Sequence, residues 1–215
     1  INVGKNALTG LKHISLELGG KSPYIILKGS NHEEAIRLCF NSIFLNSGQT
    51  CTAFSRLLIP KSEQSVIEKK LIEIAKEYTT GNPEDSSTKL GPLASLRQYE
   101  KVKSYIESGI QEGARLLYGT VPENSNNGYY ISPTIFTCVM SIARDEIFGP
   151  VLCVFPYETE EEAIRIANDT RYGLNAGVYG EKEKAIAVAK KIEAGNIYIN
   201  ASPRDTSAPF GGYKQ

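Results

Sequence analysis

The sequence has few of the residues that build metal sites and cross-linked frameworks. It contains two histidines and four cysteines among 215 residues. The cysteines, at positions 39, 51, 138 and 153, form no CxxC pair, and the common zinc sites need such pairs. We therefore expect no metal site. Few cysteines at irregular spacing also suit a reducing compartment, which favours a cytoplasmic location.

Long apolar runs and an excess of one charge are also missing. The longest apolar run covers positions 151–155, whereas a membrane span needs about 20 residues. Lys plus Arg and Asp plus Glu each number 24, so no basic surface covers the whole molecule, and we expect neither nucleic acid nor a membrane as partner. No basic-then-apolar leader is present. Because isoleucine is an unusual first residue, we interpret the chain as a fragment.

Short apolar, β-branched runs alternate with amphipathic helical patterns along the chain. We expect strands at 24–27, 56–59, 151–157, 176–179 and 196–200, and helices at 31–43, 62–78, 93–112, 159–167 and 182–194. Asn31 and Thr159 each precede a glutamate by three residues, which is the spacing of a helix cap. Continuous apolar strands between helices predict an α/β fold, with an open, mostly parallel sheet and helices on both faces. We expect the site where the carboxyl ends of the strands meet.

Cys51 is the cysteine that is best placed for chemistry. It follows Asn46-Ser47-Gly48-Gln49-Thr50, a polar stretch that interrupts the apolar helix face ending near Leu45. Glycine permits a close backbone approach, and free N–H groups at such a junction could bind an oxyanion. The alternative is a buried structural cysteine. We prefer that alternative for Cys39, Cys138 and Cys153, which lie within apolar periodicity.

A cysteine nucleophile needs a partner base. His13 and His32 are the only histidines, and His32 lies at a predicted helix cap, so a Cys–His hydrolase is disfavoured. Glu17 lies between two leucines, just before a double glycine. As an ordinary strand residue it would point outward. If it points into a cleft instead, burial would make it a usable base.

Five motifs resemble the signatures of the aldehyde dehydrogenase superfamily. In chain order they are Glu17-Leu18-Gly19-Gly20-Lys21-Ser22-Pro23, Gly48-Gln49-Thr50-Cys51, Glu146-Ile147-Phe148-Gly149-Pro150-Val151, Tyr172-Gly173-Leu174 and Pro209-Phe210-Gly211-Gly212-Tyr213-Lys214-Gln215. The separation of 34 positions between Glu17 and Cys51 is also similar to the family's. The motifs follow the family's order and span nearly the whole chain, so coincidence is implausible.

The resemblance implies an aldehyde dehydrogenase catalytic domain over residues 1–215. The implied reaction oxidises a small-molecule aldehyde to a carboxylate with NAD or NADP. Cys51 would attack as a thiolate, hydride would leave the thiohemiacetal for the nicotinamide, and Glu17 would activate the water that hydrolyses the thioester. The Cys51 backbone N–H and an asparagine from the family's amino-terminal part would hold the oxyanion. The full-length parent would be a homo-oligomer.

The resemblance also implies further contacts. Glu146 would bond the nicotinamide ribose, and Phe148 would lie near the ring. Gln98 and Lys101 would contact the adenosine-side ribose, with plain exposed helix polarity as the alternative. The other implied contacts are Leu18 and Gly19 for the cofactor and Phe44, Leu45, Thr50, Thr52 and Phe210 for the aldehyde.

For Phe44, Leu45 and Phe210, core packing is the alternative. Arg204 could anchor a carboxylate on the aldehyde, or it could pair with Asp205 or face solvent.

The chain departs from the family in its extent. The amino-terminal cofactor domain and most of the oligomerisation element are absent, and the segment before Glu17 is several residues short. We therefore expect the isolated chain to bind dinucleotide poorly. The alternative to an enzyme is an inactive fragment that acts as an interaction or structural module. Transfer of the acyl group to coenzyme A is disfavoured, because that branch often does not retain the glutamate found here at position 17.

Overall fold

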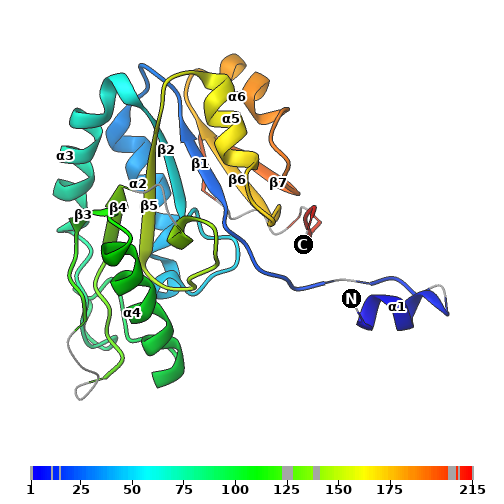
Figure 1. Cartoon of the computed structure of the whole chain (residues 1–215), viewed down its shortest axis with the longest axis horizontal. Helices are drawn as coiled ribbons and strands as arrows, with labels where there is room; N and C mark the ends of the chain where they lie inside the picture. Colours follow the sequence, from blue (N-terminus) through cyan, green and yellow to red (C-terminus); the bar gives the residue numbers. More distant parts are fainter. Residues whose placement is uncertain are drawn as a thin grey trace.

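One seven-stranded sheet organises the chain (Figure 1). The computed structural model describes every residue except 1, 11, 15, 123–127, 138–140, 203–206, 208 and 215. The strand order is β3-β4-β5-β2-β1-β6-β7. The strands are β1 (Pro23–Ile26), β2 (Arg56–Pro60), β3 (Arg115–Tyr118), β4 (Thr134–Thr137), β5 (Val151–Tyr157), β6 (Asn175–Tyr179) and β7 (Asn196–Ile199). Neighbouring strands are parallel except for β3 and β4, which confirms the predicted open, mostly parallel sheet.

Helices cover both faces of this sheet, as predicted. The helices that pack on it are α2 (His32–Ile43), α3 (Gln64–Ala75), α4 (Leu96–Gln111), α5 (Glu160–Asn168) and α6 (Lys182–Ala189). Successive side chains of a strand point to opposite faces. Accordingly, Ile26 packs with α2 and α3, whereas Ile25 packs with α5 and α6. At the other end of the sheet, α4 forms a third apolar cluster with Phe136 and Cys153.

The helix caps form at the predicted residues. Asn31 accepts a hydrogen bond from the Glu34 N–H at 3.4 Å, and Thr159 accepts one from the Glu162 N–H at 3.2 Å. The two glutamate side chains bond elsewhere: Glu34 accepts from the Tyr179 hydroxyl, and Glu162 accepts from the Glu158 N–H. The spacing therefore predicted each helix start, although neither glutamate side chain accepts a hydrogen bond from the backbone N–H of its own cap residue.

Several elements differ from the sequence-based prediction. Strands β3 and β4 were not expected, and α6 ends at Ala189 rather than near position 194. Helix α3 ends at Ala75 rather than near position 78. Short 3₁₀ turns occur at η1 (Leu45–Gly48), η2 (Lys61–Glu63) and η3 (Ser141–Ala143). These differences lie at the ends of helices and at one end of the sheet, away from its centre.

The first helix, α1 (Asn2–Leu8), lies apart from the sheet (Figure 1). None of its described residues is buried, and an isolated helix of this length is marginal in water. The described residues between 9 and 19 connect it to β1 without helix or strand structure. The three apolar clusters of the sheet therefore form without α1.

Candidate active site

The motif residues gather at the amino edge of the sheet, not at the carboxyl edge where we expected them. The glutamate motif (Glu17–Pro23) leads into β1, and the cysteine motif (Gly48–Cys51) lies just before β2. The loop of Glu146–Pro150 leads into β5. The carboxyl edge is closed by its own hydrogen bonds. There the Tyr157 hydroxyl donates to the Ile26 carbonyl at 2.8 Å, and the Ser30 hydroxyl donates to the Leu27 carbonyl at 2.6 Å. The expected location was therefore wrong, because the glycine-rich loops precede these strands instead of following them.

Cys51 lies in a tight turn that only a few residue types favour. Asn46, Ser47 and Gly48 have φ values of 50°, 54° and 77°, and such left-handed backbone suits glycine and asparagine best. The side chains of Asn46 and Gln49 each donate to the other's backbone carbonyl at 3.1 Å. Ser47, the residue least suited to this conformation, donates its hydroxyl to the Gly91 carbonyl at 2.9 Å. The turn that carries Cys51 is thus fixed by its own side chains.

Two close backbone contacts, each made by a glycine, bring three of the motifs together. A Cβ atom on Gly20 would lie 2.1 Å from the Cys51 carbonyl oxygen, and one on Gly48 would lie 2.2 Å from the Gly149 carbonyl. Any larger residue at either position would collide with backbone. The Gly20 N–H also donates to Oε1 of Glu146 at 2.9 Å. These contacts explain why glycines are needed at 20 and 48, and they bring the Cys51 and Glu146 loops side by side.

The electrostatics of Cys51 show that both predicted carboxylates lie near its sulfur. Burial raises the pKa of the Cys51 thiol above its ordinary value, and the negative charge of Glu17 raises it further. The charge of Glu146 acts in the same direction, whereas the backbone N–H groups of Cys51 and Thr52 stabilise the thiolate and lower the pKa. Glu17 itself is exposed. The charge of Glu17 therefore acts on the Cys51 sulfur, although Glu17 is an exposed residue.

The loop with Glu146 and Phe148 is held by the first turns of α4. Phe148 has φ 61°, which is strained for an aromatic residue. The Gln98 side-chain amide donates to the carbonyls of Ile147 and Phe148 at 3.0 and 2.7 Å, and the Lys101 ammonium donates to the Glu146 carbonyl at 2.9 Å. Sequence reasoning placed Gln98 and Lys101 at a cofactor ribose or on an exposed helix surface. In the structure their side chains donate hydrogen bonds to the backbone carbonyls of this loop.

The residues predicted to line an aldehyde site are dispersed. Phe44 is buried in the core, with its ring 4.9 Å from that of Phe40, so its position agrees with the core alternative. Leu45 and Phe210 are 50% and 43% exposed. Thr50 and Thr52, on either side of Cys51, are half-buried. Arg204 lies outside the described residues.

A groove of about 290 Å³ lies between the segment before β1 and the last described residues of the chain. Leu18, Gly19 and Phe210 line it together with Leu16 and Tyr213. It therefore contains two of the predicted cofactor contacts and one predicted aldehyde contact. Ile14, Leu16 and Leu18 contribute apolar side chains from alternate positions of the extended segment, and all three are exposed.

Arg56, at the start of β2, is a buried residue of this edge that sequence reasoning did not single out. Its guanidinium donates to the carbonyls of Lys21, Ile166 and Ala167 at 2.7–2.8 Å. An arginine at the first position of an otherwise apolar strand was the available signal. These hydrogen bonds connect the last turn of α5 to Lys21, the residue after Gly20. Arg56 thereby holds the glutamate motif against α5.

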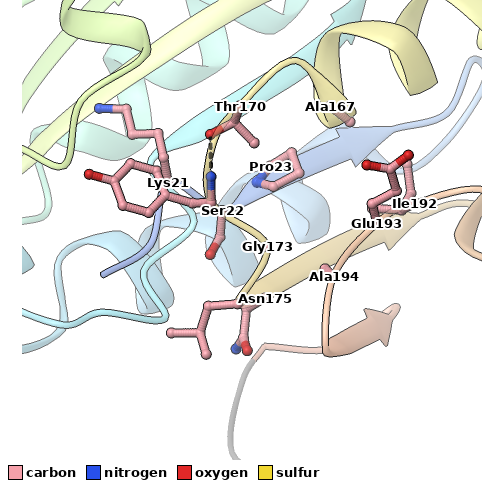
Figure 2. A pocket seen from close by; sticks show the side chains of 12 residues that line it. Lys21, Ser22, Pro23, Ala167, Thr170, Gly173, Asn175, Ile192, Glu193 and Ala194 are labelled. Carbon is pink, nitrogen blue, oxygen red and sulfur yellow. Dashed lines mark hydrogen bonds between the residues drawn. The ribbon is translucent and has the colours of Figure 1, made fainter. Parts of the chain in front are cut away.

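A narrow pocket lies beside this anchor, between the residues that begin β1 and those that precede β6 (Figure 2). Its walls include Ser22, Thr170, Gly173 and Asn175, while Cys51 and Glu17 do not line it. The pocket thus adjoins the Tyr172-Gly173-Leu174 motif behind the site. A second, small cavity is lined by Gly20, Gly48, Thr50, Glu146, Phe148 and their neighbours. That second cavity is the place where the cysteine and Glu146 motifs meet.

Two kinds of feature are absent from the described residues. No group of three or more His, Cys, Asp or Glu side chains comes together there as metal ligands would. No described helix is both long enough and apolar enough to cross a membrane. The described residues form an α/β domain in which glycine-rich loops and a half-buried thiol, Cys51, lie at the amino edge of a mostly parallel sheet.

Comparison with known proteins gives the family. The aldehyde dehydrogenase family model matches residues 1–215. A 3-succinoylsemialdehyde-pyridine dehydrogenase from a Pseudomonas species is 46% identical over 219 residues, covering 99% of this chain and 46% of that protein. An aldehyde dehydrogenase of Mycobacterium tuberculosis, solved with NAD⁺, superposes with a TM-score of 0.92 at 43% identity, covering 99% of this chain and 45% of that one.

A mutant aldehyde dehydrogenase of Pseudomonas syringae, solved with NAD⁺ and octanal, superposes with a TM-score of 0.91 at 40% identity, covering 99% of this chain and 45% of that one. The chain belongs to the aldehyde dehydrogenase family. It spans about half the length of the curated relatives it matches.

Proposed function

We propose that this chain is the catalytic domain of an enzyme that oxidises an aldehyde to a carboxylate, with Cys51 as nucleophile and Glu17 as general base. The observation that carries the proposal is the position of Gly20, three residues after Glu17: it packs against the Cys51 carbonyl and donates its N–H to the Glu146 carboxylate, which joins the three motifs at one edge of the sheet. Family membership supplies the reaction class. Because the chain covers about half of its relatives, the activity proposed is that of a polypeptide in which the remaining parts are present.

The residues at this edge fit a nicotinamide dinucleotide. The Gly20 N–H occupies Oε1 of Glu146, and the absence of a side chain on Gly19 leaves space beside Oε2, which a Cβ would approach to 2.8 Å. A carboxylate oxygen in that position can accept from a ribose hydroxyl. Two relatives that are 40% and 43% identical to this chain were solved with NAD⁺, which supports a nicotinamide dinucleotide as the cofactor. We propose that Glu146 and Phe148 hold the nicotinamide half of NAD or NADP, which, when bound, accepts the hydride.

The chemistry of the chain's own residues follows from their placement. The Cys51 thiolate adds to the aldehyde carbon, and the backbone N–H groups near the sulfur stabilise the negative charge that develops on oxygen. After hydride departure the acyl group is a thioester on Cys51. Glu17, exposed and close to the sulfur, removes a proton from the attacking water, and the thiolate leaves as the carboxylic acid forms. Aldehyde, water and the oxidised cofactor thus yield acid, reduced cofactor and a proton.

An activated ester tests this proposal without a cofactor. p-Nitrophenyl acetate delivers an acetyl group to a nucleophilic thiol and so forms the proposed thioester directly. We expect a burst of about one equivalent of p-nitrophenolate per chain, followed by slow turnover. Cys51→Ala should abolish the burst. Glu17→Gln should retain it and slow the later phase, whereas Glu73→Gln, an exposed residue on α3, should change neither phase.

A full burst from the Cys51→Ala chain would refute the proposal. The inactive-fragment alternative is separated by a second measurement, in which NAD⁺ is titrated into the chain by calorimetry and NADH formation is followed with an aldehyde present. An ester burst without NAD⁺ binding would assign the acylation chemistry to this chain and dinucleotide binding to the parts of the protein beyond it.

A further inference from the structure

Gln98 makes a hydrogen-bonding arrangement that its predicted ribose contact does not explain. One side-chain nitrogen donates to two consecutive carbonyls, those of Ile147 and Phe148. Consecutive carbonyls of an extended chain point in opposite directions. They converge on a single donor here because the backbone turns at Phe148, where φ is 61°. The amide of Gln98 is therefore matched to the strained conformation of Phe148.

The position of Gln98 is itself fixed by the fold. Its backbone N–H donates to the Ser95 side chain, which caps α4. One and four positions further along the helix, Tyr99 and Val102 are buried in the apolar cluster that also contains Ile147. Gln98 thus extends from a helix that cannot shift without disturbing the core, and it bonds to the loop at the point of highest backbone strain.

The strained loop is connected to the sulfur site by one further bond. Oε1 of Glu146, two residues before Phe148, accepts from the Gly20 N–H, and Gly20 packs against the Cys51 carbonyl. Beyond Phe148, Gly149 packs against Gly48 in the turn that carries Cys51. A change in the Phe148 peptide would therefore move the Glu146 carboxylate relative to Cys51.

We propose that Gln98 is a positioning residue that holds Phe148 in its left-handed conformation and thereby sets the Glu146 carboxylate against Gly20. This role rests on the proposed function, in which Glu146 and Phe148 hold the nicotinamide half of the cofactor. It differs from a direct ribose contact, because it acts before any cofactor binds. It also predicts that Gln98 matters only while residue 148 has a side chain that strains the turn.

The exchange rate of the Gly20 amide proton reports the position of the Glu146 carboxylate directly, because that carboxylate accepts its hydrogen bond. Amide exchange can be measured by NMR on the chain in the absence of cofactor. Gln98→Ala should speed exchange of the Gly20 amide about tenfold, since non-glycine residues disfavour the left-handed conformation. The amides of Val102 and Ile106, inside α4, should not change. Arg97→Ala, at the preceding exposed position of the same helix, is the matched control and should have no effect on Gly20.

A double-mutant cycle separates positioning from general stability. Phe148→Gly removes the strain, so adding Gln98→Ala to it should change Gly20 exchange by less than about twofold. Phe148→Ala removes the ring but retains the strain, so adding Gln98→Ala should still give the full increase. Equal effects of Gln98→Ala in the glycine and alanine backgrounds, or equal acceleration at Gly20 and inside α4, would overturn the proposal.

The ester assay keeps this result independent of the proposed function. A chain that shows the Cys51 burst, but no Gln98 effect on Gly20, would retain the thioester chemistry and lose the positioning role. A chain with the full Gln98 cycle and no burst would retain the loop coupling and lose the catalytic proposal.

Discussion

The backbone N–H of Gly20 donates to the carboxylate of Glu146 at 2.9 Å, across 126 positions of sequence. This single bond joins the loop that leads into β1 to the loop that leads into β5. Gly20 at the same time packs against the carbonyl of Cys51. The Cys51 loop, the glutamate motif and the Glu146 loop therefore form one connected unit, and a change in any of them should alter the surroundings of the Cys51 sulfur.

The first prediction concerns which cysteines react. Cys51 is half-buried, whereas Cys39 and Cys153 are fully buried. Iodoacetamide added to the folded chain should therefore modify Cys51 and leave Cys39 and Cys153 unmodified until the chain is unfolded. Peptide mapping by mass spectrometry gives the extent at each site. Modification of Cys39 at the rate of Cys51 would contradict the described burial.

The second prediction concerns the pH dependence of that reaction. Burial and the charge of Glu17 raise the pKa of Cys51, so the alkylation rate should keep increasing at pH values above the ordinary thiol range. Glu17→Gln removes a negative charge, which lowers the pKa of Cys51. Alkylation near neutral pH should then accelerate, by about tenfold for each pKa unit.

The direction of this change is informative. If Glu17 deprotonated the thiol, the same substitution would slow alkylation, so a slower Glu17→Gln chain would assign that role to it. Glu73→Gln on α3 is the charge-matched control and should leave the profile unchanged.

A third prediction concerns the glycine contact at the site. Alanine at position 20 would place its Cβ 2.1 Å from the Cys51 carbonyl oxygen, so one of the two backbones must move. Gly20→Ala should lower the free energy of unfolding by about 1–3 kcal/mol and change the alkylation rate of Cys51. Gly4→Ala, where a Cβ meets nothing within 4 Å, is the control and should stay within about 0.5 kcal/mol. Urea titration gives the free energy of unfolding of both variants.

The buried guanidinium of Arg56 gives a fourth prediction. Arg56→Met keeps most of the side-chain volume but leaves the Lys21, Ile166 and Ala167 carbonyls without their donor. The loss should be at least about 1–3 kcal/mol, the cost of one buried acceptor left without a partner. Arg56→Lys retains one donor group and should recover part of this loss. Equal stability of the methionine chain and the wild type would show that these bonds contribute little.

The sequence predicted the centre of the fold well, because the information there is local. Runs such as those around Ile25 and Val154 are apolar and β-branched, so they form strands regardless of neighbours. Strand β3, in contrast, is four partly exposed residues at the end of the sheet. Its pairing with β4 supplies what its own sequence does not indicate, and it was missed for that reason.

The candidate site residues could be named from the sequence, but their location in the fold could not. Cys51 and Glu17 could be named because the motifs are short and contiguous. Their position at the amino edge, the contact of Gly20 with Cys51 and the bonding of Gln98 to the Phe148 loop are long-range backbone relationships. They depend on where distant loops meet, which no local pattern of residue types encodes.

A site at the amino edge of a parallel sheet lies near the carboxyl ends of the helices that connect its strands. α2 ends at Ile43 shortly before the Cys51 turn, and α5 ends at Asn168, where Arg56 takes up two of its final carbonyls. The partial negative charge at the end of α2 adds to that of Glu17 and Glu146, whereas the Arg56 guanidinium offsets the charge at the end of α5. This field resists the formation of an anionic sulfur on its own and attracts a positively charged ring to its side. An oxidised nicotinamide carries that charge, so its arrival would itself favour ionisation of the nucleophile.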